Sequence, residues 1–265
     1  MKPTLRTVTV TRYVTPLREG SSLPAIVEAD DDGLYVLKFR GAGQGTKALI
    51  AELLAGEIAR AIGLRVPEIV FANLDSELSR LEPDPEIQEL LSASAGLNLA
   101  LDYLPGSVTF TPLAMPVDGT LASRIVWFDC FVTNVDRTPR NVNMLVWHKN
   151  IWLIDHGAAL YFHHAWRGWE EQARSQFSRV SDHILLPHAS ELQAIDAELR
   201  HYLTADKLDR IVALIPDDWL HGNAFGQHDL SAHDKRDVYK MFLRERLATS
   251  TIFVQEALRA RETRV

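Results

Sequence analysis

The segment from residue 128 to residue 157, FDCFVTNVDRTPRNVNMLVWHKNIWLIDHG, constrains the fold more than any other part of this chain. It begins with an apolar run that passes into a polar stretch containing a proline, which predicts a buried helix followed by a loop. Two short strands then flank residues 148–150, and this pattern predicts a hairpin. If the strands pair about that turn, Asp155 lies opposite Asn143 or Met144, close to the preceding loop.

Three polar side chains of this segment are expected to converge: Asp136 and Asn141 from the loop, and Asp155 from the end of the hairpin. Oxygen atoms of Asn141 and Asp155 suit Mg²⁺, which prefers hard oxygen ligands. Asp136 then remains free to orient or deprotonate a nucleophile. A metal-binding pair beside a free carboxylate is what phosphoryl transfer requires, so the sequence predicts a phosphotransferase site.

Lys38 lies in a predicted apolar strand, residues 34–39, where a charged side chain is costly unless it is paired. It is either an edge-strand lysine that faces solvent or the partner of a carboxylate near a phosphate. The helix that follows, which Thr46 is expected to cap, carries two candidate carboxylates, Glu52 and Glu57. Glu52 lies off the apolar stripe of the helix, and Glu57, five residues further on, points elsewhere.

Together these residues resemble the protein-kinase-like fold, in which a catalytic Asp is followed by x4-Asn and then by Asp-x-Gly, here Asp155-His156-Gly157. The version N-x-D-R-x-x-x-N is more similar to HipA-type serine/threonine kinases and phosphatidylinositol kinases than to typical protein kinases. Over about its first two thirds, the chain most resembles compact HipA-like kinase domain proteins. The resemblance implies an α+β, two-lobed fold, with a small antiparallel-sheet N-lobe (residues 1–104) and a mainly helical C-lobe (residues 105–265).

The same resemblance implies that ATP and Mg²⁺ bind between the lobes and that the γ-phosphate passes to a hydroxyl acceptor. Its catalytic residues would be Asp136, Lys38 and Asn141, and its metal ligands Asn141 and Asp155. Lys38 would position the phosphates, and a loop would cover them. The hinge after a predicted strand would meet adenine. The implied nucleotide-binding residues are Lys38, Glu52, Ser21, Ser22, Leu101, Asp102 and Tyr103.

Several residues near this site have two open interpretations. Arg137 and Arg140 either neutralise charge on the γ-phosphate or hold the loop in place through a carboxylate. Asp129, about one turn before the loop, is either a helix surface charge or an acceptor that holds the loop. The adjacent His163 and His164 lack a third ligand at a fixed spacing, which favours a polar loop surface over a metal site.

Three other functions are compatible with the sequence, and the first is transfer of phosphate to a small molecule. Aminoglycoside phosphotransferases, which act on small molecules, usually carry His-Gly-Asp before x4-Asn, whereas Thr133-Asn134-Val135 precedes Asp136 here. A nucleotide-binding pseudokinase that recruits partners, and a binding protein without nucleotide, are the other two. The acceptor is unknown, and Thr138, where phosphatidylinositol kinases usually have a histidine, argues against a lipid.

Composition bounds the setting of the protein. Its single cysteine, Cys130, excludes an internal disulfide and suits a reducing cytoplasm. The net charge of −7 without a basic cluster argues against direct nucleic-acid binding. No apolar run approaches the ~20 residues of a membrane span, and no signal peptide is recognisable. Beyond Gly168 the chain is expected to be helical, with one long helix over residues 234–261.

Overall fold

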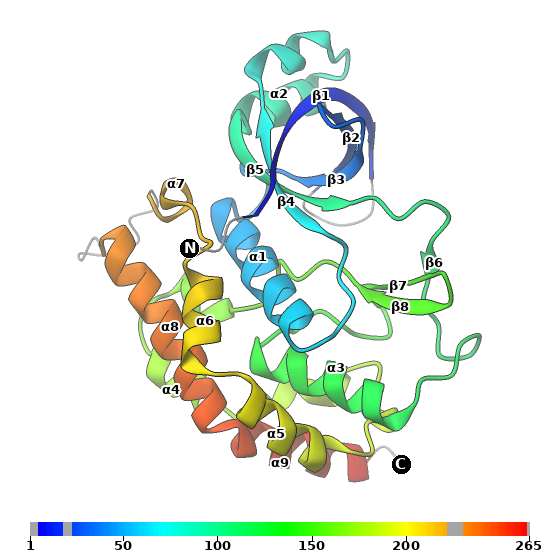
Figure 1. Cartoon of the computed structure of the whole chain (residues 1–265), viewed down its shortest axis with the longest axis vertical. Helices are drawn as coiled ribbons and strands as arrows, with labels where there is room; N and C mark the ends of the chain where they lie inside the picture. Colours follow the sequence, from blue (N-terminus) through cyan, green and yellow to red (C-terminus); the bar gives the residue numbers. More distant parts are fainter. Residues whose placement is uncertain (1–4, 18–22, 222–229, 264–265) are drawn as a thin grey trace.

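The first part of the chain forms a closed β-barrel in the computed structural model, which describes residues 5–17, 23–221 and 230–263. Five strands make the barrel, in the order β1-β2-β3-β5-β4 (Figure 1). Its apolar interior is filled by side chains that alternate along each strand. The strands are β1 (Thr7–Pro16), β2 (Ala25–Ala29), β3 (Leu34–Lys38), β4 (Ile69–Leu74) and β5 (Gly96–Asp102).

The barrel is antiparallel, as the family resemblance implies, except for one parallel pairing. The start of β1 pairs in parallel with β4, from Thr7 opposite Phe71 to Thr9 opposite Asn73. Further along, β1 pairs antiparallel with β2, and its register shifts twice. Such shifts increase the local twist and bend a strand. A long, bent β1 can therefore reach β4 and close the sheet, which pattern reading of separate strands does not reveal.

Helix α1 (Thr46–Ala61) follows β3 and lies beneath the barrel in Figure 1. Thr46 does not cap it, because the N-cap is Gly45 and the Thr46 hydroxyl instead donates to the carbonyl of Trp219, 3.0 Å away. The helix ends at Ala61, and Gly63, just beyond it, has a φ of 81° that suits glycine. Between β4 and β5 the chain adds η1 (Ser76–Leu81) and α2 (Pro85–Ala93).

The predicted hairpin is present and belongs to a second sheet of β6 (Val108–Thr109), β7 (Met144–Trp147) and β8 (Asn150–Leu153). Its turn is one residue shorter than expected, because only His148 and Lys149 stand outside the ladder, both with positive φ. Two left-handed residues are what a tight hairpin turn needs. Met144 consequently pairs with Leu153, and Asp155 lies two residues beyond that pair.

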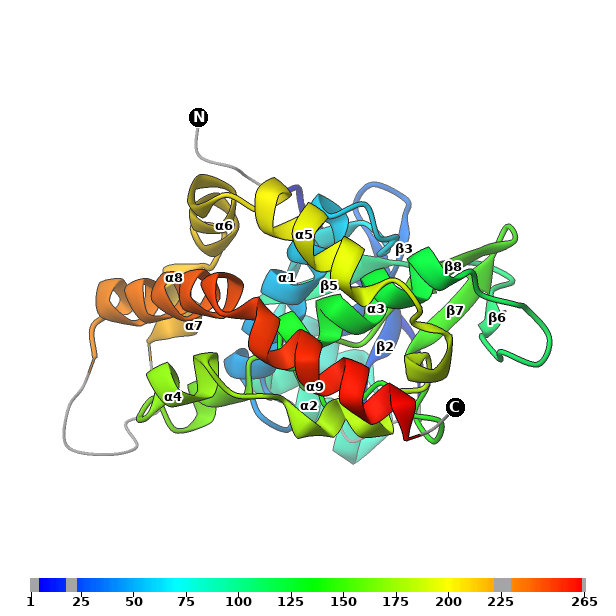
Figure 2. The same ribbon diagram turned by 90° about the horizontal axis from the view of Figure 1, so that it is seen from below.

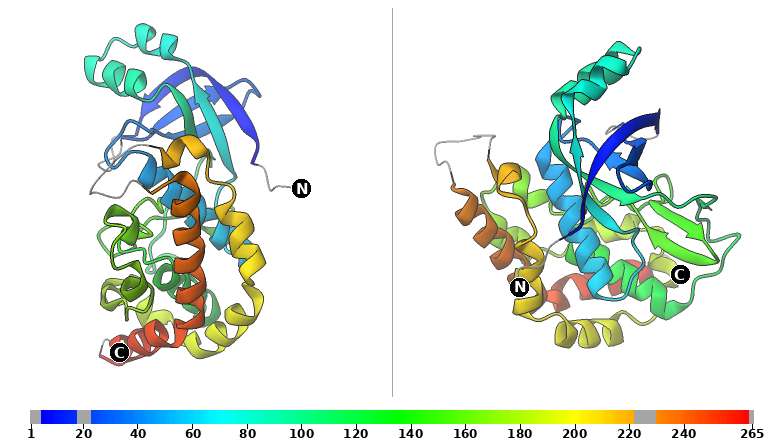
Figure 3. Two further views of the ribbon diagram at one scale, coloured as in Figure 1. Left: turned by 90° about the vertical axis from the view of Figure 1, so that its left-hand side faces the viewer. Right: turned by 45° about the horizontal axis from the view of Figure 1, so that its top comes forward.

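The second part of the chain is helical, as predicted, and lies at the opposite end of the molecule from the barrel (Figure 3). From below, α3, α5 and α9 lie side by side (Figure 2). The helical elements here are α3 (Gly119–Phe131), η2 (Tyr161–His164), α4 (Trp169–Ala173), η3 (Ser178–Asp182), η4 (Leu186–His188), α5 (Leu192–Tyr202), α6 (Ala205–Val212), α7 (Asp217–Leu220), α8 (Ala232–Ala248) and α9 (Ser250–Glu262).

The prediction of a single long helix over residues 234–261 is wrong. The structure has two helices there, α8 and α9, separated at Thr249. The Thr249 hydroxyl donates to the carbonyl of Glu245 at 2.8 Å, a contact that bends helices. After the break the chain changes direction and runs beneath α3 (Figure 1). Side-chain periodicity continues across such a bend, so it does not mark the break.

One large apolar cluster extends through the helical part and includes the buried face of α1. Leu53 and Leu54 of α1 belong to the same cluster as Phe128 and Phe131 of α3. The barrel interior forms a separate cluster. Helix α1 therefore packs with the helical part as well as beneath the barrel, and the predicted lobe boundary at residue 104 remains a prediction. Across the described ranges, no helix combines the length and apolar character needed to cross a membrane.

Candidate active site

Lys38, Glu52 and Asp155 meet where the barrel, α1 and the hairpin come together. The Lys38 ammonium lies 2.5 Å from Oδ1 of Asp155 and 3.3 Å from Oε2 of Glu52. Lys38 ends β3, Glu52 is on the buried side of α1, and Asp155 follows β8. Asp155 has a φ of 56°, a left-handed conformation that costs energy outside glycine and is typical of functional sites.

The charges of this group are mutually compensated. Burial disfavours the Lys38 cation, but the carboxylates of Glu52 and Asp155 outweigh it and raise the pKa of Lys38 above its ordinary value. Burial likewise disfavours the Glu52 anion, yet Lys38 and contacts from His156 lower the pKa of Glu52. Lys38 and Glu52 therefore stay charged near neutral pH, as an ion pair that holds α1 against the end of β3.

Glu52 also fixes the segment that carries Asp155. Its Oε2 accepts the His156 backbone N–H at 2.8 Å, and its Oε1 lies 3.1 Å from the His156 Nδ1. Both side chains are buried, with at most 1% of either exposed. One carboxylate thus joins the lysine on β3 to the Asp155-His156-Gly157 segment, so a shift of α1 would disturb both.

The loop between α3 and β7 holds Asp136 and Asn141 in direct contact. The Asn141 side-chain amide donates to Oδ2 of Asp136 at 2.7 Å, which leaves the amide oxygen of Asn141 free to face outward. The side-chain amide of Asn143 lies 3.5 Å from both Oδ2 of Asp136 and the backbone carbonyl of Asp155. Asn143 therefore links the loop to the segment that follows the hairpin.

Beneath this loop is a buried charged cluster centred on Asp129. Its carboxylate accepts from Arg137 Nε at 2.6 Å, from the Asn134 amide at 2.8 Å and from His183 Nε2 at 2.9 Å. The Leu185 backbone N–H donates to Nδ1 of the same histidine, which leaves Nε2 as the protonated nitrogen of a neutral ring. Burial would raise the pKa of Asp129, but Arg137 and His183 lower it.

This cluster settles the two interpretations left open for Asp129 and Arg137. Asp129 is an acceptor that holds the loop, and Arg137 is fully buried and pins the loop through that carboxylate. Arg137 also donates to the backbone carbonyl of Asn143. It cannot reach a phosphate from this position, whereas Arg140 is exposed and has no such anchor among the described residues.

The donor chemistry around Asn141 and Asp155 fits a Mg²⁺ ion that keeps waters and phosphate oxygens in its shell. The two residues offer one free amide oxygen and one carboxylate, whose Oδ2 has no partner in the described part of the chain. Across the residues that the structure describes, no group of three or more His, Cys, Asp or Glu side chains could hold a metal ion.

The remaining predicted nucleotide contacts are dispersed. Leu101 pairs with Val36, two residues from the pair of Lys38 with Leu99, so Leu101 lies on the Lys38 side of the sheet. Asp102 lies on the opposite side of the sheet, and its backbone N–H donates a hydrogen bond to the carbonyl of Glu68. The N–H of Tyr103 is used by Leu34. Ser21 and Ser22 lie outside the described residues.

Sequence reading missed the supporting residues Asn143, His156 and His183. Asn143 and His156 lie within or beside the motifs, but their roles depend on contacts across 12 and 104 positions of sequence. His183 carries no motif at all. The interpretation of His163 as a surface residue was wrong, because its ring is fully buried and bonded to the Tyr239 hydroxyl at 2.8 Å. Burial keeps the pKa of His163 well below its ordinary value.

Comparison with known proteins identifies a family for the sequence and related structures for the fold. A family model described as HipA-like kinase matches residues 10–247. The fold is similar to the crystal structure of the Helicobacter pylori proinflammatory kinase CtkA, at 13% identity and a TM-score of 0.55, over 96% of this chain and 99% of that one. It is also similar to the Golgi casein kinase with Mn/ADP bound, at 11% identity and a TM-score of 0.52, over 97% of this chain and 74% of the other.

No curated protein sequence matches the chain. Identities this low establish a shared kinase fold and nothing finer, which confirms the predicted two-lobed architecture. The family model, in contrast, spans both the barrel and the helical part, including Lys38, Glu52, Asp136, Asn141 and Asp155. The chain therefore belongs to the HipA-like kinases.

Proposed function

We propose that this HipA-like kinase transfers the γ-phosphate of ATP to a hydroxyl acceptor with the help of Mg²⁺. The observation that carries the proposal is the contact of Lys38 with both Glu52 and Asp155. A strand lysine paired with a helix glutamate, beside a carboxylate able to hold a metal, is the arrangement that positions nucleotide phosphates in this fold. The nucleotide and metal in the Golgi casein kinase structure, Mn/ADP, are consistent with it.

In this proposal Lys38 binds the α- and β-phosphates, and Glu52 keeps its ammonium in place. Asn141 and Asp155 hold Mg²⁺, which when bound neutralises charge on the phosphate oxygens. Leu101 borders the adenine. The carbonyl groups of Asp102 and Tyr103 remain candidate acceptors for its amino group, because their N–H groups are already used.

Asp136 orients the acceptor hydroxyl and takes its proton as the new P–O bond forms and the bond to the β-phosphate oxygen breaks. The amide of Asn141 steadies that carboxylate at 2.7 Å. The hydroxyl nucleophile is the part of the proposal that the chain itself specifies least. A protein or small-molecule acceptor fits equally well, and transfer in either case uses the same donor-side residues.

The test measures thermal unfolding with and without ATP and Mg²⁺, together with ADP formation, for the native chain and for Asp155→Ala. Ligand at about a hundred times its Kd stabilises the native state by ~2.7 kcal/mol, which raises Tm by roughly 5–10 °C. We expect that shift to need Mg²⁺ and to vanish in Asp155→Ala, with ADP formation lower by about three powers of ten. The exposed residue Glu89 of α2 supplies the control Glu89→Ala.

The outcomes separate the rival functions. A Tm shift without any ADP formation would favour a nucleotide-binding module over an enzyme. No shift at saturating ATP would remove the kinase activity from consideration, and retention of normal turnover in Asp155→Ala would exclude Asp155 as a metal ligand.

A further inference from the structure

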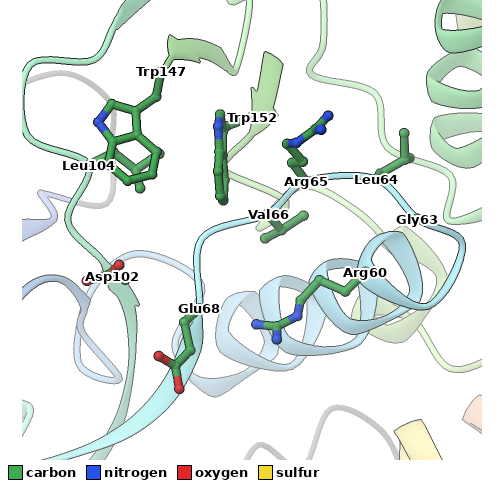
Figure 4. A pocket seen from close by; sticks show the side chains of 10 residues that line it. All are labelled: Arg60, Gly63, Leu64, Arg65, Val66, Glu68, Asp102, Leu104, Trp147 and Trp152. Carbon is green, nitrogen blue, oxygen red and sulfur yellow. The ribbon is translucent and has the colours of Figure 1, made fainter. Parts of the chain in front are cut away.

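A cavity of about 430 Å³ lies beside the point where β5 leaves the barrel (Figure 4). The end of α1, the loop from α1 to β4, the end of β5 and the β7–β8 hairpin all contribute to its wall. None of the five residues assigned to the active site lines it. It is largely open to solvent, and its volume lies in the range of pockets that bind ligands.

Two tryptophans form the aromatic wall of this cavity. The hairpin register places Trp147 and Trp152 on the same face, because Trp152 pairs with Leu145, two residues before Trp147. Their ring centroids are 5.4 Å apart and the planes meet at 74°. Trp147 is held by its indole N–H, which donates to the carbonyl of Pro105 at 3.0 Å. The two rings therefore pack edge to face, and together they present an aromatic surface that attracts a cation.

One side of the cavity is acidic. Asp102 and Glu68 lie together in Figure 4, as neighbours across the pairing of β5 with β4. Glu68 is already neutralised by Arg6, 3.1 Å away, whereas Asp102 has no ion pair within the described residues. Burial and the charge of the nearby Glu68 raise the pKa of Asp102, and the charge of Arg6 offsets this only in part. The unpaired negative charge is therefore that of Asp102.

The other side is basic. In Figure 4 the Arg60 side chain extends toward Glu68, and Arg65 lies on the far side of the cavity, beside Trp152. Arg60 has one ion pair, with Glu57 at 3.6 Å, and the Arg65 side chain has none in the described part of the chain. The backbone of Arg65 is fixed, since its carbonyl accepts the Leu153 N–H at 2.8 Å. An occupant that satisfies both sides must carry a cation and, a short distance away, an anion.

We propose that this cavity binds a polypeptide segment in which an arginine or lysine side chain lies close to an aspartate or glutamate. The basic group would lie against the aromatic surface that Trp147 and Trp152 form together and face Asp102, and the acidic group would face Arg65. A free basic amino acid fits less well, because its α-ammonium group would accompany its carboxylate to the two arginines. The binding does not depend on kinase activity, although the hairpin that carries Trp152 leads directly to Asp155.

The test titrates the full chain with the blocked peptide acetyl-Gly-Arg-Gly-Glu-Gly-amide and follows tryptophan fluorescence and heat. We expect saturable binding with a Kd of about 1 mM, consistent with one cation–π site and two exposed charge contacts. Asp102→Asn should weaken it about tenfold and Arg65→Gln about threefold. The matched control Glu89→Gln removes an equivalent charge from the exposed face of α2 and should leave the Kd unchanged.

Three results would overturn the proposal. The first is no saturable binding at about 10 mM peptide. The second is an Asp102→Asn variant that binds the peptide as well as the native chain does. The third, free L-arginine binding as tightly as the peptide, would exclude a polypeptide as the intended occupant. Failure of this test leaves the ATP experiment untouched, because the two use different ligands and different test variants, and Asp102 enters the nucleotide proposal only through its backbone carbonyl.

Discussion

At the scale of single residues, the buried carboxylate of Asp129 explains how the loop with Asp136 keeps its shape. Asp129 is completely buried and receives four hydrogen bonds, two of them from the buried guanidinium of Arg137. Removing one member of a buried ion pair costs more than the pair contributes, since the other charge is left without a partner. The loop is therefore anchored by a residue that does not touch the reacting atoms.

Asp129→Asn should lower the free energy of unfolding by about 3–5 kcal/mol, because Arg137 then stays buried without its counter-charge. Urea unfolding near neutral pH measures this. Glu198→Gln breaks an exposed ion pair with Arg124 and should cost at most ~1 kcal/mol. Equal losses in the two variants would contradict the anchoring role of Asp129.

The pH dependence of stability follows from the same group. Asp129 and Glu52 both have a folded-state pKa below the ordinary value. The unfolded chain therefore binds more protons than the folded chain below about pH 5, and stability falls as the pH is lowered. We expect unfolding measurements between about pH 6 and about pH 3.5 to show this decline. Asp129→Asn should make the slope shallower, and an unchanged slope would rule out the lowered pKa of Asp129.

At the scale of elements, Arg246 of α8 joins three parts of the helical region. Its guanidinium donates to the carbonyl of Cys130 at 2.7 Å, to that of Ala173 at 3.0 Å and to that of Ser175 at 2.7 Å. These carbonyls end α3 and α4, where a cation also complements the helix dipole. Burial lowers the pKa of Arg246 to about 10, so it remains charged at neutral pH.

Arg246→Met should destabilise the protein by about 3 kcal/mol or more, because several buried carbonyls lose their donor. We also expect faster proteolysis around α4, measured by limited digestion. Arg244→Met on the same helix removes an exposed ion pair with Asp209 and should change stability by less than ~1 kcal/mol. If Arg246→Met proved as stable as Arg244→Met, contacts other than those of Arg246 would hold α3 and α4 together.

At the scale of the whole molecule, α1 connects the barrel to the helical part. Its buried leucines share an apolar cluster with α3, while its Glu52 pairs with Lys38 of the barrel. A fragment of residues 1–104 would expose that face of α1 to water. We expect the isolated fragment to lack a cooperative thermal transition by circular dichroism and to regain one when residues 105–265 are co-expressed. A cooperatively folded fragment would contradict this dependence.

Features that depend on local patterns could be predicted from the sequence, whereas features that depend on contacts between distant positions could not. The strand that carries Lys38, α1 and the hairpin could be predicted, because period-two and period-3.6 patterns report directly on which face of an element is buried. The Lys38–Glu52 pair could also be predicted, through the resemblance that named both residues. The break at Thr249 and the burial of His163 could not, because each depends on what packs against the residue after the chain has folded.

The sequence by itself determined the local elements and the family of the catalytic loop, since these follow from short-range patterning and motif spacing. Only the tertiary structure decided that β1 closes the barrel on β4, that Asp129 anchors Arg137, and that Asp102 faces away from Lys38. Each of these depends on contacts between distant positions. Such contacts arise from the shape of the packed chain, and no single segment encodes them.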